Sequence, residues 1–148
     1  MSAKKIGRGV KAALLAVLVI VLCGCTTSKS LYLETDRNDR IRITLDTTDG
    51  HDMRYVDNLL RISYEGRDEL EGVIVSGEGY EDFLDRLRED YSFRKESEPF
   101  SYEWCEQDGE TVFLCPISPQ RAGMILSSAS PFESIRPVVE KLSFSTYE

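Results

Sequence analysis

The densest group of candidate metal ligands in this 148-residue chain is the loop from Asp46 to Asp52. It holds the carboxylates Asp46, Asp49 and Asp52 and the only histidine of the chain, His51. Hard cations are bound by several oxygen atoms at short spacing along one loop, and this loop offers them. It lacks the spacing and the distal bidentate glutamate of an EF-hand. A solvated acidic turn around Gly50 explains the same residues, so we assign no metal here and keep the four side chains as weak candidates.

The residues of the common hydrolytic mechanisms do not come together in this sequence. A serine or cysteine triad needs a histidine, His51 is alone, and no Gly-x-Ser-x-Gly turn is present. Zinc hydrolysis needs several histidine or cysteine ligands, and this sequence lacks such a set. Among 26 acidic residues some pair always lies at the distance that glycoside hydrolysis requires, so such pairs carry no information. We therefore assign no catalytic residue and no cofactor, and we expect a protein that is not an enzyme.

The two glycines of Gly77-Glu78-Gly79 match part of the pattern of a phosphate-binding loop. The third glycine and the lysine of such a loop are missing, and Glu81 and Asp82 follow directly. Because these carboxylates repel anions, we expect no phosphate site at the start of the following helix.

The first 24 residues have the order of a secretory signal peptide. Four basic residues come first, an apolar run from Ala12 to Leu22 follows, and small residues precede Cys25. A helix over residues 12–24 would reach only about 20 Å, against roughly 30 Å of membrane hydrocarbon. We therefore expect a removed signal peptide rather than a permanent membrane span.

The stretch Leu22-Cys23-Gly24-Cys25 resembles the lipobox of bacterial lipoproteins. The resemblance implies cleavage after Gly24, a thioether-linked diacylglycerol on Cys25, and a further acyl chain, such as palmitate, on the new amine. Two or more acyl chains anchor a protein stably to a membrane. The expected location is the cell membrane or the outer membrane, outside the cytoplasm.

The exported part of the chain is strongly acidic. Removing residues 1–24 takes away four of the 18 Lys and Arg, which leaves 14 against 26 Asp and Glu, a net charge of −12. This charge repels nucleic acid and anionic lipid headgroups. The expected partners are the membrane, through the lipid on Cys25, and an unidentified envelope protein or ligand.

Residues 25–30 are expected to be a lipidated tether, and residues 31–148 a single domain. Alternating apolar residues predict a hairpin over 31–35 and 40–46. The second half of the segment 53–64 is expected to be a strand. Its first half fits either a helix or a strand. We expect a turn over 65–68, a short strand over 73–75 and a further strand over 122–129.

Two helices are expected. The first spans about 79–90, where Tyr80, Phe83, Leu84 and Leu87 share one face. The second spans about 131–142, begins at a capping box in which Ser130 is the N-cap and Glu133 reaches back, and is bent by Pro137. Residues 143–147 are expected to be an extended tail.

Asp108-Gly109 is the strongest hairpin signal in the chain and lies between two apolar runs, 100–105 and 111–117. A two-residue turn there places Trp104 opposite Phe113.

The same register points the side chains of Cys105 and Cys115 to opposite faces, which forbids a bond between them. An exported location and an even number of remaining cysteines favour a disulfide instead, through a wider loop centred on Glu110. Both alternatives remain open at this stage.

These elements predict an α+β fold with one antiparallel sheet of about six to seven strands and two packed helices. The layout of residues 79–145 resembles the PsbP-like fold of small bacterial lipoproteins. We expect a membrane-anchored surface lipoprotein with a non-catalytic binding or scaffolding role in the cell envelope. The alternatives are a cation-dependent binding module that uses the loop 46–52 and an unrecognised hydrolase.

Overall fold

The computed structural model describes residues 27–35, 38–118 and 121–147. The signal peptide and Cys25 lie outside these ranges. No helix within them is long and apolar enough to cross a membrane.

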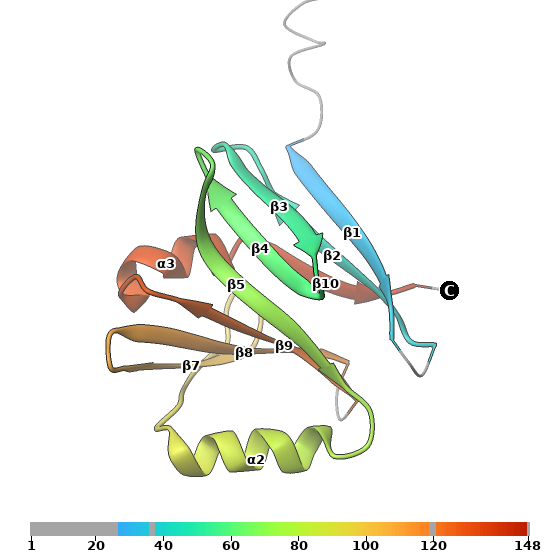
Figure 1. The fold of residues 1–148 in the computed structure, drawn as a ribbon, viewed down its shortest axis with the longest axis vertical. Helices are drawn as coiled ribbons and strands as arrows, with labels where there is room; N and C mark the ends of the chain where they lie inside the picture. The colour runs from blue at the N-terminus through green and yellow to red at the C-terminus, as the bar shows by residue number, and fades with distance from the viewer. Residues whose placement is uncertain (1–26, 36–37, 119–120, 148) are drawn as a thin grey trace, which may run out of the picture.

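The fold contains two antiparallel sheets and two helices (Figure 1). The three-stranded sheet has the order β1-β2-β10, with β1 Ser28–Glu34, β2 Arg40–Asp46 and β10 Leu142–Thr146. The seven-stranded sheet has the order β3-β4-β5-β9-β8-β7-β6, with β3 His51–Val56, β4 Leu59–Tyr64, β5 Arg67–Ser76, β6 Arg94–Glu96, β7 Tyr102–Gln107, β8 Glu110–Ser118 and β9 Ala122–Ser128. The helices are α2 Tyr80–Asp90 and α3 Phe132–Val139. The expected two helices and an antiparallel sheet of about six to seven strands are confirmed, and the expectation that it is the single sheet is wrong.

The C-terminal segment is the third strand of the smaller sheet. Residues 143–147 were expected to be a tail, yet β10 pairs with β2 and places Phe144 opposite Ile43. The second helix was expected to reach Leu142 but ends at Val139. Leu142 is buried in the strand, as it would be on the apolar face of a longer helix, so burial alone does not distinguish the two conformations.

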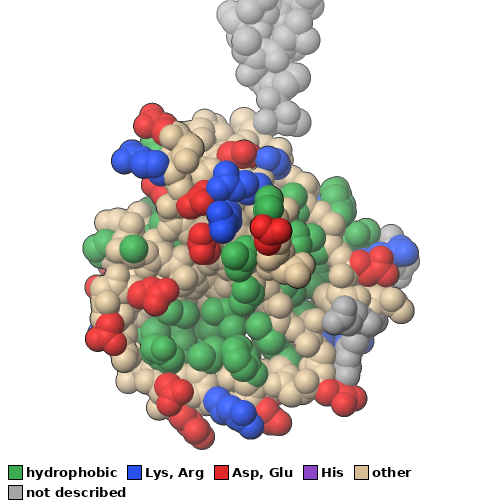
Figure 2. Space-filling view, viewed as in Figure 1, with side chains coloured by type: hydrophobic (Ala, Val, Ile, Leu, Met, Phe, Trp, Pro, Cys, Tyr) green, Lys and Arg blue, Asp and Glu red, His purple; other side chains and the backbone are tan. Residues whose placement is uncertain are grey.

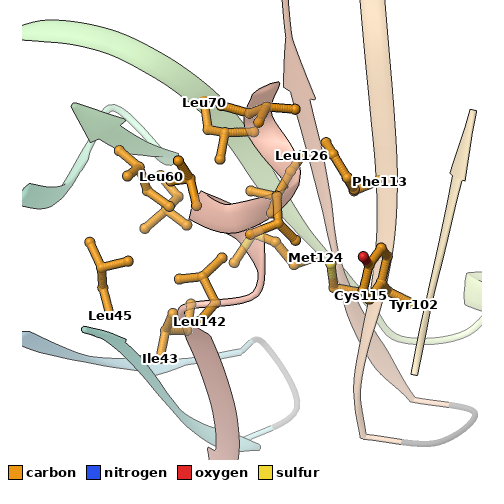
Figure 3. Packing of buried hydrophobic residues seen from close by; sticks show 14 of the residues in the cluster. Ile43, Leu45, Leu60, Leu70, Tyr102, Phe113, Cys115, Met124, Leu126 and Leu142 are labelled. Carbon is orange, nitrogen blue, oxygen red and sulfur yellow. The ribbon is translucent and has the colours of Figure 1, made fainter. Parts of the chain in front are cut away.

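The main core lies between the two sheets, with α3 packed into it. Alternate residues of β2, namely Ile41, Ile43 and Leu45, are fully buried. Figure 3 shows how Ile43, Leu45 and Leu142 approach the buried side chains of the seven-stranded sheet. We call the face of the seven-stranded sheet that meets this core the inner face.

The ambiguous segment from residue 51 to residue 64 is a hairpin. Asp57 and Asn58 form its turn, with φ angles of 54° and 62°. Both residue types tolerate positive φ, which a two-residue turn between strands requires. The following turn, at Glu65-Gly66, leads into β5, which is longer than the expected strand over 73–75.

The hairpin at Asp108-Gly109 has the expected register, with Trp104 opposite Phe113 and Cys105 opposite Val112. Both cysteines are free and buried. Cys115 belongs to the main core, whereas Cys105 lies on the other face of the ribbon. The bridge that an exported location favours is therefore absent, because the tight turn turns the two sulfur atoms away from each other.

The start of α3 is held by β7 rather than by a capping box. The ring of Phe132 stacks on the ring of Trp104 with a centroid distance of 3.5 Å and an interplanar angle of 3°. The backbone N–H of Phe132 donates to Oε2 of Glu106 at 3.0 Å. The N-cap residue is Pro131, with no side-chain cap, so the expected capping box of Ser130 and Glu133 is wrong. A carboxylate from a neighbouring strand replaces it.

The stack gives the first prediction. Replacing Trp104 with Ala removes a buried ring that packs on both Phe132 and β8, and we expect a loss of about 3–5 kcal/mol in the free energy of unfolding. Urea denaturation measures it. Phe83→Ala, at a ring that is 41% exposed, is the matched control and should lose less than about 1 kcal/mol. Equal losses in the two variants would show that the stack does not anchor α3.

The second prediction concerns the two thiols. Burial raises the pKa of both Cys105 and Cys115, and the thiolate is the reactive form. We expect neither to be alkylated by iodoacetamide at pH 8 in the folded protein, and both to be alkylated after unfolding without reductant. Peptide mass mapping locates the label. Val56→Cys, at a half-exposed position, is the positive control, and a pair of peptides joined through Cys105 and Cys115 would contradict the free thiols.

Candidate functional site

The structure does not gather the carboxylates of the loop between β2 and β3 around one point. Oδ1 of Asp46 accepts a hydrogen bond from the backbone N–H of Thr48 at 2.9 Å and another from its hydroxyl group, and these bonds lower the pKa of Asp46. Nζ of Lys29 donates to Oδ1 of Asp52 at 2.7 Å, which lowers the pKa of Asp52. The carboxylates of Asp46 and Asp52 are thus each hydrogen-bonded within the chain, to different partners.

The remaining two candidates, Asp49 and His51, contact each other. Nδ1 of His51 lies 2.8 Å from Oδ1 of Asp49, and its Nε2 lies 2.9 Å from Oε2 of Glu69 in β5. Asp49 also pairs with Lys141. Sequence reasoning missed Glu69 and Lys141 because strand pairing, rather than proximity in the chain, brings them to the loop.

This arrangement matches neither a metal site nor a triad. Within residues 27–35, 38–118 and 121–147, no three His, Cys, Asp or Glu side chains come together so that they could hold a metal ion. Both ring nitrogens of His51 face carboxylates, whereas in a triad one of them faces the nucleophile. We interpret His51 as a link between the loop and β5.

A different surface has the character of a binding site. The face of the seven-stranded sheet that carries α2, which we call the outer face, is apolar over its central strands. Strand register aligns one row across it and a second row beside it: Val73, Ile125, Leu114 and Glu103, then Val75, Gly123 and Pro116. Figure 2 shows hydrophobic side chains gathered in one area directly above α2.

Helix α2 covers only part of this face. Its residues Tyr80 and Leu84 are buried against Leu114, as the helical stripe predicts. Phe83, expected on the same stripe, is 41% exposed, and Val73 on the sheet is 38% exposed. The helix therefore leaves apolar surface open on both elements.

A groove of about 230 Å³ lies between α2 and the outer face. Its walls include Leu84 of the helix and Leu114 and Ile125 of the sheet. Gly123 forms part of its floor, and a Cβ at this position would collide with the hydroxyl group of Tyr80. The absence of a side chain at Gly123 thus allows the Tyr80 ring to lie on β9, and burial raises the pKa of Tyr80.

An ion pair joins α2 to the sheet beside the groove. Arg88 donates to both oxygens of Glu103 in β7, from Nη2 at 2.7 Å and from Nε at 3.2 Å, and this bonding raises the pKa of Arg88. Nη1 of Arg88 also donates to Asp85 at 3.1 Å. Bidentate pairs of this kind fix geometry as well as charge. Sequence reasoning missed the pair, since Glu103 comes 15 residues after Arg88 and on another element.

The helix that borders the groove is acidic. Residues 78–90 contain six Asp and Glu against two Arg, a net charge of −4. The charge of Arg88 is already shared between Asp85 and Glu103. Glu81 and Asp82 form no ion pair with any described residue. The surface therefore combines an apolar floor with negative charge along one side.

Compared with known protein families, with curated proteins and with solved structures, the chain has no match. The functional interpretation consequently rests on the residues and their geometry.

Proposed function

We propose that this protein is a membrane-anchored surface lipoprotein with a non-catalytic binding or scaffolding role in the cell envelope. The observation that carries the binding role is the outer face, where Val73 is exposed, Ile125 is partly buried and the groove beside α2 is lined by apolar side chains. Contiguous exposed apolar surface of this kind marks interaction sites on soluble domains.

The anchor would hold the domain close to the membrane. Strand β1 begins at Ser28, which pairs with Asp46, so three residues of the expected tether are part of the sheet. Three virtual bonds separate Cys25 from Ser28, a distance of at most about 11 Å. The lipid on Cys25 would thus be joined almost directly to β1.

The anchored end and the groove lie at opposite ends of the molecule. In Figure 1 the long axis is vertical, β1 begins at the upper end, and α2 lies at the lower end. An anchor next to Ser28 would leave α2 and the groove at the end of the domain farther from the anchor. This arrangement suits a protein that binds a partner in the surrounding compartment.

A PsbP-like fold is the more specific structural hypothesis. Its support is the order of elements between residues 80 and 146, in which α2 is followed by the strands β6 to β9, by α3 and by β10. The resemblance transfers no functional residue to this chain.

The lipid anchor gives the third prediction. Cys25→Ser removes the acceptor thiol, so we expect the variant to incorporate no radioactive palmitate and either to remain an uncleaved precursor or to be released and leave the detergent phase. Cys23→Ser is the matched control and should keep both the label and the partitioning. Label retained in Cys25→Ser would contradict the assignment of the anchor.

The binding role gives the fourth prediction. A photoreactive amino acid at Val73, on the outer face, should form a discrete protein adduct in intact cells. The same amino acid at Val56, which is 50% exposed at the edge strand β3, should form none. Blotting for this protein after irradiation detects the adducts. No adduct from Val73, or the same adduct from both positions, would contradict a partner on the outer face.

A further inference from the structure

We infer that the outer face binds a protein segment in which apolar side chains are flanked by Lys or Arg. This inference rests on the proposed function and names the chemistry of the partner. It follows from the size of the apolar surface and from the charge beside it.

The size of the surface favours a protein segment over a small molecule. The groove of about 230 Å³ is smaller than the roughly 300–1,000 Å³ of typical small-molecule pockets. Apolar surface continues beyond it to Val73, which does not line the groove but lies in the same cross-strand row as Ile125. A segment with one apolar side chain in the groove and another on Val73 would cover both.

The charge beside the groove favours a basic segment. Glu81 lines the groove directly, and Asp82 follows it in the first turn of α2. Arg88, which also lines the groove, is held by the carboxylates of Asp85 and Glu103. Lys or Arg of a partner would therefore meet negative potential, and an acidic segment would be repelled.

The same charge argues against two other occupants. A second copy of this chain would bring another acidic α2 to the surface, with like charges opposed. An anionic membrane surface would be repelled in the same way.

The test uses the whole chain from residue 25 to residue 148, produced without its first 24 residues so that it is not acylated. Three synthetic 14-residue peptides are the probes: one of Leu and Lys, one of Leu and Glu, and one of Ser and Lys, each with a photoreactive residue at its centre. Anisotropy titrations at low salt give the affinities, and mass mapping after irradiation gives the contact positions. We expect the Leu/Lys peptide to bind and to crosslink to residues 73–87 and 112–125.

Two variants separate charge from apolar contact. Glu81→Lys with Asp82→Lys should weaken binding of the Leu/Lys peptide by about tenfold and allow the Leu/Glu peptide to bind. Its matched control is Glu65→Lys with Glu133→Lys, which changes net charge equally at the β4–β5 turn and on α3, away from the groove; it should change the affinity less than about twofold. Val73→Thr with Ile125→Thr keeps both side chains β-branched but makes them polar, and should weaken binding without altering the preference for Lys over Glu.

The outcomes distinguish this inference from the proposed function. Equal weakening in both charge variants, or equal binding of the Leu/Lys and Leu/Glu peptides, would overturn the basic partner and leave the Val73 adduct in cells intact. Equal binding of the Ser/Lys peptide would overturn the apolar contact. Crosslinks that join two copies of this chain through residues 73–87 would show self-association and overturn the inference. If the photoreactive amino acid at Val73 forms no adduct in cells, the proposed function itself is overturned.

Discussion

The seven-stranded sheet is apolar on its inner face and over the central strands of its outer face, and this constraint shapes the rest of the molecule. The inner face is covered by the three-stranded sheet and α3. On the outer face the only covering helix within the described residues is α2, whose 11 residues extend about 16 Å. Seven strands at about 4.8 Å spacing span about 29 Å from one edge strand to the other. One short helix therefore cannot cover the sheet. The outer side chains of the uncovered strands are of two kinds, charged and apolar.

Toward the edge at β3, the outer positions are charged. Arg61 lies beside Glu71 across β4 and β5, with Nε and Oε1 3.5 Å apart, and Arg54 donates two hydrogen bonds to Asp68. These positions tolerate water. Further along β5, β9 and β8, from Val73, Ile125 and Leu114 to Val75, Gly123 and Pro116, the outer positions are apolar although α2 reaches only some of them. The change from ion pairs to apolar side chains within one face is the physical basis for proposing a binding surface on the central strands.

Local sequence patterns predicted much of the fold because neighbours in the chain determine those elements. Alternation identified β2, the dipeptide Asp108-Gly109 set the register of β7 and β8, and helical spacing identified α2. The misses depend on contacts between distant segments. Residues 142–146 become a strand only because β2 offers an edge, and α3 is capped by Glu106 of β7. The groove depends on the pairing of Arg88 with Glu103 and on the Tyr80 ring over Gly123, and no local pattern predicts such contacts.

The most direct test of this account compares the exposure of Val73 in the isolated protein and in the intact envelope. Carbene footprinting with a small diazirine reagent labels exposed side chains, and mass mapping reports the label at each residue. A partner on the outer face predicts that Val73 is labelled in the isolated protein and protected in the envelope, while Val56 is labelled equally in both. Equal labelling of Val73 in the two samples would contradict the assignment of the outer face as a binding surface.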